Sequence, residues 1–254
     1  MKSNHILFAS VIIAGMLAGC KKHELEPLPF QYGTDAPNLK VVHASAFTTN
    51  TAVQLKLNDV RISNNMTYST PFPGGGQNTG GSNFPYWVQG VAGSNKISLS
   101  IPKAGTATDS VVVSNNTVTL EKGKSYTAYI TDTGANNQLI LVTENLALPA
   151  QGTSRYRFIN LIPNLASADL YYGPTLVASN VAYKSLSPEF TLTTGQALAF
   201  AVRTAGSGAS GTVLATYTPA AVPNQRILTV YSRGYLNTGT TGNRLPAVSL
   251  LYNQ

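Results

Sequence analysis

The chain has 254 residues and is poor in charge, since 11% of its side chains are acidic or basic and the formal net charge is +7. The basic side chains are scattered and form no stripe with interleaved aromatic residues, so we expect no nucleic acid partner. The single cysteine excludes internal disulfides, and His43 is the only histidine beyond residue 38, so we expect neither a multi-histidine metal site nor a cofactor.

Residues 1–20 carry the strongest signal in the chain. Lys2 gives a positive start, an apolar run follows over residues 6–17, and small residues precede Cys20. The run is shorter than the about 20 apolar residues that cross a bilayer. It predicts a signal peptide over residues 1–19, and LAGC at residues 17–20 resembles the lipobox of bacterial lipoproteins.

This resemblance implies that Cys20 carries lipid, and that acyl chains such as palmitate hold the protein to a membrane. Residues 20–38 contain three prolines and no clean period, so we expect a flexible tether. The residue after the cysteine is Lys21. An aspartate at this position would resemble a signal that retains lipoproteins in the inner membrane. We therefore expect a lipid-anchored protein of the cell envelope, at the outer membrane, on its periplasmic or its outer face. An ordinary signal peptide or a membrane anchor is the alternative.

The remainder of the chain has an all-β composition, because β-branched residues are frequent and turn residues recur at short intervals. It also repeats itself. The aligned segments are residues 39–44 with 156–161, residues 53–57 with 168–172 at an offset of 115, and residues 97–101 with 198–202 at an offset of 101. We predict two tandem β-sandwiches of the immunoglobulin-like or fibronectin type III-like class, at residues 39–146 and 155–254.

Alternation of apolar and polar residues predicts which side chains face the two cores. The inward residues are Val53, Leu55 and Leu57 in the first sandwich, and Ala168, Leu170 and Tyr172 in the second. Asp169 and Tyr171 then point outward. Tyr126 follows Leu120 by six residues, with a turn glycine between them. This spacing resembles the tyrosine corner, in which the hydroxyl bonds a backbone group across the corner.

A glycine-rich and aromatic insertion at residues 71–90 explains why the two offsets differ. It contains three successive glycines, and we expect a loop without strands. Phe84, Tyr86 and Trp87 are candidate ligand-binding residues, because aromatic faces beside amide side chains suit sugar rings or protein partners. The alternative is structural: Trp87 and Phe84 plug one end of the sandwich, and the glycines form a floppy connection.

Three segments resemble a known family. Residues 41–45 read VVHAS, residues 169–173 read DLYYG, and residues 176–185 read LVASNVAYKS. They resemble the V-x-V-x-(H/N)-A-S start, the D-V-Y-x-x-G strand and the A-S-N-x-x-Y segment of the bacterial envelope family catalogued as domain of unknown function 4397. The glycine comes one residue early, and QLKLN at residues 54–58 lacks the aspartate and the tyrosine. The resemblance covers nearly all of residues 39–253 as two copies. It implies an immunoglobulin-like sandwich on a secreted or lipidated protein, without an established activity, cofactor or catalytic residue.

The residues predict no catalytic constellation. His43 and Ser45 would share one face of a strand, but a triad also needs an oriented acid and an oxyanion hole. DTG at residues 132–134 is similar to the catalytic triplet of aspartic proteases. The second copy has SRG at residues 232–234 in its place, so we expect a turn at Asp132.

We therefore expect a non-catalytic envelope lipoprotein that presents its sandwiches for binding, or serves as a structural accessory of an envelope assembly. The first alternative is a carbohydrate-binding or adhesion protein that uses residues 71–90, with a glycan or an envelope protein as its partner. The second alternative is a cryptic hydrolase, which would have to gather His43 and one of the scattered acids in one pocket.

Overall fold

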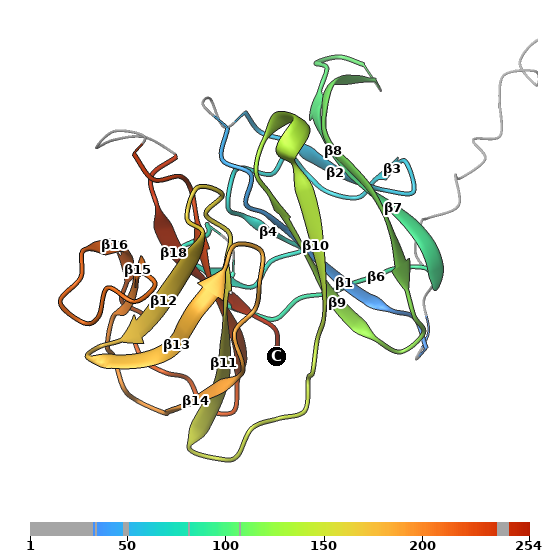
Figure 1. The fold of residues 1–254 in the computed structure, drawn as a ribbon. Coiled ribbons are helices and arrows are strands. Elements are labelled where there is room, and N and C mark those ends of the chain that lie inside the picture. The colour runs from blue at the N-terminus through green and yellow to red at the C-terminus, as the bar shows by residue number, and fades with distance from the viewer. Residues whose placement is uncertain (1–32, 34, 48–50, 81, 107, 238–243) are drawn as a thin grey trace, which may run out of the picture.

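The computed structural model describes residues 33, 35–47, 51–80, 82–106, 108–237 and 244–254. Within these ranges the regular structure is β-strand, apart from one 3-10 turn, η1 (Gly134–Asn136). The strands form sheets that pack face to face, and none of these sheets closes into a barrel (Figure 1). The prediction of an all-β sandwich protein is confirmed. The predicted signal peptide, Cys20 and most of the tether lie outside the described residues.

The first sandwich contains two sheets, an inner sheet that faces the second sandwich and an outer sheet on the far side of the core. Its inner sheet has the order β10 (Gln138–Thr143), β9 (Ser125–Thr131), β1 (Asn38–His43) and β4 (Pro71–Phe72), and β6 (Val88–Gln89) also pairs with β1. Its outer sheet has the order β3 (Val60–Arg61), β2 (Gln54–Leu57), β7 (Gly93–Pro102) and β8 (Asp109–Leu120).

The second sandwich also contains two sheets. Its inner sheet has the order β14 (Phe190–Thr193), β11 (Thr153–Asn160), β17 (Ile227–Arg233), β18 (Ala247–Tyr252) and β5 (Gly76–Gln77). Its outer sheet has the order β13 (Thr175–Ala182), β12 (Ser167–Tyr172), β15 (Phe200–Thr204) and β16 (Val213–Tyr217). One of these strands, β5, comes from the part of the chain that otherwise builds the first sandwich.

The two sandwiches share one strand order. In each of them the first strand pairs in parallel with a late strand, β1 with β9 and β11 with β17. Lys40 pairs with Thr127, and Arg157 pairs with Thr229. Lys40 and Arg157 therefore hold equivalent positions, in agreement with the alignment of residues 39–44 with 156–161.

The alignment of residues 97–101 with 198–202 is wrong by two residues. Leu57 of β2 pairs with Ile97, whereas the equivalent Tyr172 of β12 pairs with Phe200 and not with Leu198. A shift of two residues leaves every side chain on the same face of its strand. Alternation alone therefore cannot detect it.

Each sandwich has its own apolar core between its two sheets. Val53, Leu55 and Leu57 are buried in the first core, and Ala168, Leu170 and Tyr172 are buried in the second, as alternation predicts. Burial of one such aliphatic or aromatic side chain contributes about 1.5–3 kcal/mol. These two cores are the main source of stability in a protein without disulfides.

Asp169 and Tyr171, which alternation predicts to be outward, are buried. The Asp169 carboxylate accepts hydrogen bonds from the backbone N–H groups of Asn180 at 2.7 Å and Gly206 at 2.9 Å. The guanidinium of Arg203 covers the Tyr171 ring at 5.4 Å from its centroid. The outer face of β12 is thus covered by two turns of the chain and by an arginine side chain.

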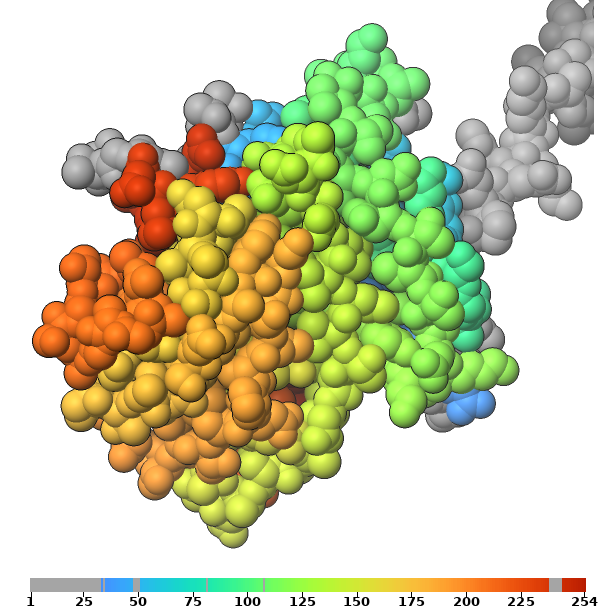
Figure 2. Space-filling model, viewed as in Figure 1, coloured from blue at the N-terminus to red at the C-terminus, as the bar shows by residue number. Residues whose placement is uncertain are grey.

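The two sandwiches pack against each other through their inner sheets, and a third apolar cluster lies between them. Val42, Tyr129 and Val142 come from the first sandwich, and Ile159, Tyr231 and Leu251 come from the second. The equivalent residues Tyr129 and Tyr231 meet with ring centroids 6.2 Å apart. Both faces of the inner sheets are covered, so β9 is buried at every position. Figure 2 shows the two sandwiches abutting as one body.

The predicted tyrosine corner is confirmed. The hydroxyl of Tyr126 accepts a hydrogen bond from the backbone N–H of Glu121 at 3.1 Å. The ring itself is buried in the first core. The bond fixes the turn that leads from β8 into β9, and β9 is the strand that carries one side of the contact between the sandwiches.

Candidate functional site

The insertion at residues 71–90, called the strap below, joins the two sandwiches. It contains three short strands: β4 and β6 pair with β1 of the first sandwich, and β5 pairs with β18 of the second. The prediction of a loop without strands is therefore wrong. Its glycines let the chain bend sharply, so that short segments between the bends reach the open edges of two different sheets.

The glycines of the strap are held in place by neighbouring atoms. The carbonyl oxygen of Gly75 accepts a hydrogen bond from the backbone N–H of Tyr252 at 2.7 Å. Gly75 has a φ of +94°, and a Cβ on this residue would lie 2.4 Å from the carbonyl oxygen of Phe84. This position accepts only glycine without a shift of the backbone, because both the torsion angle and the space exclude a side chain. The glycines are therefore not the floppy connection of the structural alternative.

Side chains complete the attachment of the strap to the second sandwich. Gln77 Nε2 donates to the Tyr252 hydroxyl at 2.6 Å, and Asn78 Nδ2 donates to the carbonyl oxygen of Val248 at 2.7 Å. The carbonyl oxygen of Asn78 accepts from Ser249 Oγ at 2.8 Å and from Arg233 at 3.0 Å. The two polar residues next to the glycines thus bind this protein's own strands.

The three candidate aromatic residues of the strap do not share one pocket. Phe84 is 59% exposed and Tyr86 is 50% exposed, and their ring centroids lie 5.9 Å apart. We call these two residues the aromatic pair. Trp87 is half-buried, and the Lys40 ammonium lies over its ring at 4.5 Å from the centroid. Trp87 therefore covers a lysine, while the aromatic pair faces outward.

A hollow of about 340 Å³ borders the strap at residues 71–73 and at Gly80. Its lining includes Asn64, Asn65, Thr67 and Pro73. Next to Pro73, the ring of Tyr86 lies 3.2 Å from the position that a Cβ on Gly74 would take. The hollow thus borders the strap near Tyr86 and is rich in amide and hydroxyl groups. Aromatic rings and such groups together can bind a polar ring by stacking and hydrogen bonding.

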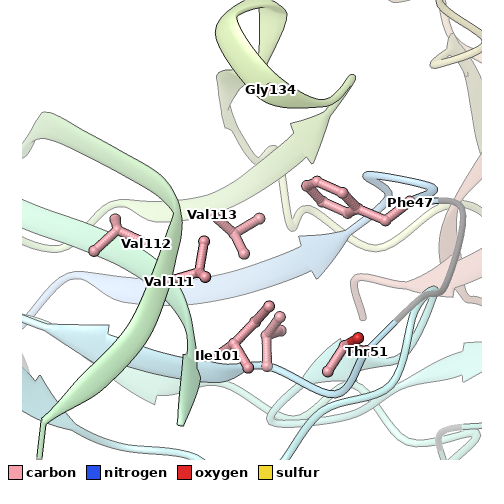
Figure 3. Close-up of a pocket in the computed structure, with 8 residues that line it drawn as sticks. Phe47, Thr51, Ile101, Val111, Val112, Val113 and Gly134 are labelled. Carbon is pink, nitrogen blue, oxygen red and sulfur yellow. The ribbon is translucent and has the colours of Figure 1, made fainter. Parts of the chain in front are cut away.

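An apolar groove of about 320 Å³ lies on the outer sheet of the first sandwich (Figure 3). It is lined by Phe47, Val53, Ile101 and residues 111–113, and Val111 and Val112 are more than half exposed. Three successive valines in β8 are the signal by which the sequence could have revealed it, because alternation predicts only one buried face for such a strand and leaves a valine on the other. This run was not singled out as a candidate site from the sequence.

A buried polar cluster between the inner sheets also escapes sequence analysis. We call it the inner-sheet cluster; its members are Lys40, Glu144, Arg157 and Asn253. Arg157 forms an ion pair with Glu144, whose side chain is 1% exposed, and Asn253 Nδ2 donates to the same Glu144 oxygen at 2.9 Å. Burial lowers the pKa of Lys40 to about 7, and the charge of Glu144 opposes this shift.

His43 and Ser45 do not form a catalytic pair. His43 is fully buried, its ring lies edge-on to Tyr68 at a centroid distance of 6.1 Å, and burial lowers its pKa to about 4. Ser45 Oγ accepts a hydrogen bond from Asn137 Nδ2 at 2.9 Å. The structure uses both side chains for packing and for fixing a turn.

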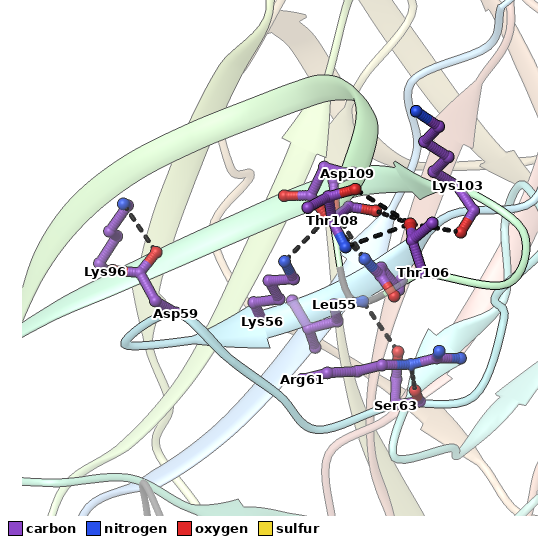
Figure 4. Close-up of polar contacts among 12 residues, drawn as sticks. Leu55, Lys56, Asp59, Arg61, Ser63, Lys96, Lys103, Thr106, Thr108 and Asp109 are labelled. Atoms are coloured by element: carbon purple, nitrogen blue, oxygen red, sulfur yellow. Dashed lines mark hydrogen bonds and ion pairs between the residues drawn. The ribbon is translucent and has the colours of Figure 1, made fainter.

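Asp109 and Asp132 serve local structure. Asp109 binds Lys56 at 2.8 Å, and Gln54 and Ser100 donate to the same carboxylate (Figure 4). The hydrogen bond from Lys56 is the main reason why the pKa of Asp109 is lowered. Asp132 has a φ of +62° and accepts from the Tyr235 hydroxyl at 2.8 Å, so it belongs to a turn.

Among the residues that the structure describes, no group of three or more His, Cys, Asp or Glu side chains could hold a metal ion. The same residues include no helix that is long and apolar enough to cross a bilayer.

Comparisons with known proteins give one family. A family model described as a domain of unknown function (DUF4397) matches residues 37–167, which is more than half of the chain. The match spans the first sandwich, β11 and the first residue of β12. The resemblance of the second copy beyond residue 167 stays a prediction.

None of the curated proteins matches the chain. Among solved structures, a crystal structure of a candidate cell adhesion protein from Bacteroides uniformis is similar with a TM-score of 0.22 and 7% identity. That comparison covers 88% of this chain and 100% of the other. A likeness at this TM-score carries no argument about fold or function.

Proposed function

The chain belongs to the family described as domain of unknown function DUF4397, and from this premise we propose that it is a non-catalytic, lipid-anchored envelope protein that presents a binding surface. The lipid on Cys20 holds it to the membrane, and the two sandwiches carry the surface away from the bilayer. The surface is the aromatic pair, Phe84 and Tyr86, together with the amide-lined hollow that borders the strap.

One observation carries this proposal. The strap is attached to both sandwiches by paired strands, yet its two outermost rings remain half exposed or more. Large exposed rings cost free energy when water surrounds them, and they mark binding surfaces when they are grouped. A rigid backbone beneath them reduces the entropy that a ligand would otherwise have to overcome on binding.

The polar network favours binding over catalysis. Asp109 is paired with Lys56, Asp132 with the Tyr235 hydroxyl, and Asp169 with the backbone N–H groups of two turns. A general acid or base needs a carboxyl group free to exchange a proton with a substrate. These three carboxylates are instead committed to an ion pair and to turns.

A carbohydrate is the ligand that the surface suits best. The tilted pair of rings offers apolar faces against which a sugar ring can stack. Asn64, Asn65 and Thr67 of the neighbouring hollow offer donors and acceptors for its hydroxyl groups. A protein partner remains the second candidate, since aromatic residues are also enriched in protein interfaces.

The test is a binding screen of the chain, purified from membranes in detergent, against envelope glycans and envelope proteins. The double variant Phe84→Ala with Tyr86→Ala should abolish binding of the captured ligand and should leave the fold unchanged, because both side chains are exposed. Leu148→Ala is the matched control, since Leu148 is 58% exposed and lies outside the strap. Equal binding by the double variant and the control would refute the proposal.

Two other changes would be poor tests. Deletion of residues 74–83 removes β5 and the bonds to Tyr252 and Val248, so it would damage the fold as well as any site. Trp87→Ala would uncover the buried Lys40. The structure therefore directs the experiment to the aromatic pair.

A further inference from the structure

The inner-sheet cluster places an amine, a carboxylate and a carboxamide together inside the protein. Lys40 and Asn253 are each 0% exposed. The Lys40 amine donates to the backbone carbonyl of Tyr252, the residue directly before Asn253. Asn253 Nδ2 donates to Glu144 Oε2 at 2.9 Å and to Thr229 Oγ1 at 2.9 Å. All these groups lie between the two inner sheets.

The equivalence of the two sandwiches shows what is unusual about this arrangement. Glu144 follows β10 directly and Asn253 follows β18 directly, and the strand registers make them equivalent positions. Lys40 and Arg157 are also equivalent. Arg157 of the second sandwich reaches the Glu144 carboxylate of the first. On the equivalent path, the Lys40 amine ends at the backbone carbonyl of Tyr252, and the next residue carries a carboxamide where the other half has a carboxylate.

The amine has the character of a nucleophile. Burial lowers the pKa of Lys40 to about 7, so much of it is uncharged near neutral pH and has a free lone pair. The ring of Trp87 covers it on one side. A desolvated lysine of this kind is a recognised route to covalent chemistry by an amine.

The two other groups have unused hydrogen-bonding atoms. Glu144 Oε1 and Asn253 Oδ1 are both buried and have no hydrogen-bond partner. A buried carboxylate oxygen without a donor can accept a proton, and it lies on the same side chain that already binds the amide nitrogen of Asn253. The carboxamide oxygen is equally free to take up charge during an attack on its carbon.

We propose that Lys40 and Asn253 form an intramolecular amide bond that joins the first strand of the protein to the residue after its last strand. The Lys40 amine turns from the Tyr252 carbonyl to the adjacent side chain, and its lone pair forms a bond from Nζ to Cγ of Asn253. Glu144 takes a proton from Nζ and delivers it to Nδ2. The bond between Cγ and Nδ2 then breaks and ammonia leaves. No oxidant, metal or cofactor takes part, and the product is one new amide and one ammonia.

The bond would close almost the whole described chain into a ring and would tie the two sandwiches covalently. Such a cross-link stabilises a fold mainly because it reduces the conformational freedom of the unfolded chain. This chain has no disulfide to serve that purpose, since Cys20 is its only cysteine.

The test is mass spectrometry of the full chain purified from membranes, after digestion with trypsin. We expect residues 23–56 and residues 245–254 to be recovered as one joined species, one ammonia lighter than the sum of the two peptides, with cleavage after Lys40 blocked. Recovery of residues 23–40, 41–56 and 245–254 as separate peptides of unaltered mass would overturn the proposal.

Variants identify the reacting groups. Lys40→Met and Asn253→Ala should each abolish the joined species, and Glu144→Gln should reduce its yield at least tenfold. Asn253→Asp should form the same joined species by loss of water. Lys122→Met is the control, since Lys122 is exposed, and should keep the joined species. If a variant fails to fold, the wild-type digest still decides the question. A joined species that persists in Asn253→Ala would place the bond elsewhere and contradict the proposal.

Discussion

His43 offers the sharpest test of the energetics in this structure. Its side chain is 1% exposed, its Nδ1 has no hydrogen-bond partner, and Tyr68 lies edge-on beside it. Burial lowers its pKa from 6.5 to about 4. The unfolded chain therefore binds a proton at a higher pH than the folded chain does. Stability that is complete above about pH 6.5 is lost as the pH falls toward 4.

The size of this effect follows from the two pKa values. One pKa unit corresponds to about 1.4 kcal/mol, so protonation of His43 should cost about 3 kcal/mol of unfolding free energy between pH 7 and pH 4. That is a large part of the 5–15 kcal/mol by which proteins are typically stable. Other groups titrate over the same interval, so a variant is needed to isolate this one.

The variant is His43→Leu, which fills the buried position with an apolar side chain of similar size and removes the titratable ring. Urea unfolding at several pH values between 7 and 4 gives the free energy for both proteins. We expect the difference between them to shift in favour of the variant by about 3 kcal/mol as the pH falls. Parallel pH profiles for the two proteins would refute the reasoning, because they would mean that His43 does not titrate on unfolding.

Three other predictions concern the anchor, the strap and the corner. Cys20→Ser should move the protein from the membrane to the soluble fraction, because a serine cannot carry the thioether-linked lipid. Each methylene of the acyl chains contributes about 0.8 kcal/mol to membrane binding. Retention of the variant on the membrane after a salt wash would contradict the lipid anchor. Gly75→Ala should lower the free energy of unfolding, measured in urea, by roughly 2–4 kcal/mol. Gly105→Ala, which is also at positive φ but in open space, should lower it by only about 1 kcal/mol. Equal losses in the two variants would mean that the strap does not constrain Gly75. Tyr126→Phe should lower the free energy of unfolding by about 1–3 kcal/mol, because it leaves the Glu121 N–H without its acceptor. The control Tyr86→Phe, at an exposed ring, should leave it almost unchanged. An unchanged free energy for Tyr126→Phe would mean that the corner bond does not stabilise the fold.

Local patterns predicted much of this fold. The alternation around Leu55 and Leu170 placed the correct residues in the two cores, and the spacing of Leu120 and Tyr126 predicted the corner bond. These features depend on period and on short-range geometry, which a sequence displays directly. The inner sheets were harder, because their second faces are covered by another sandwich, and polar residues such as Thr127 and Ser249 are buried there.

The candidate site was predicted only in part. Phe84, Tyr86 and Trp87 were chosen for their residue types, but sequence gave no means to separate the exposed pair from the ring that covers Lys40. The strap pairs β5 with a strand some 170 residues later in the chain, and no local signal in Gly76 or Gln77 announces such a pairing. The inner-sheet cluster likewise depends on contacts between Lys40 and the last residues of the chain, which only the packed sheets bring together.

The proposed binding surface depends on the two sandwiches forming one body, because the strap holds the aromatic pair in place only while both inner sheets keep their contacts. Differential scanning calorimetry of the full chain in detergent tests this directly. We predict a single transition whose calorimetric enthalpy equals its van't Hoff enthalpy, as expected for one cooperative unit. Two separate transitions would contradict the single cooperative body, because they would show that each sandwich unfolds without the other.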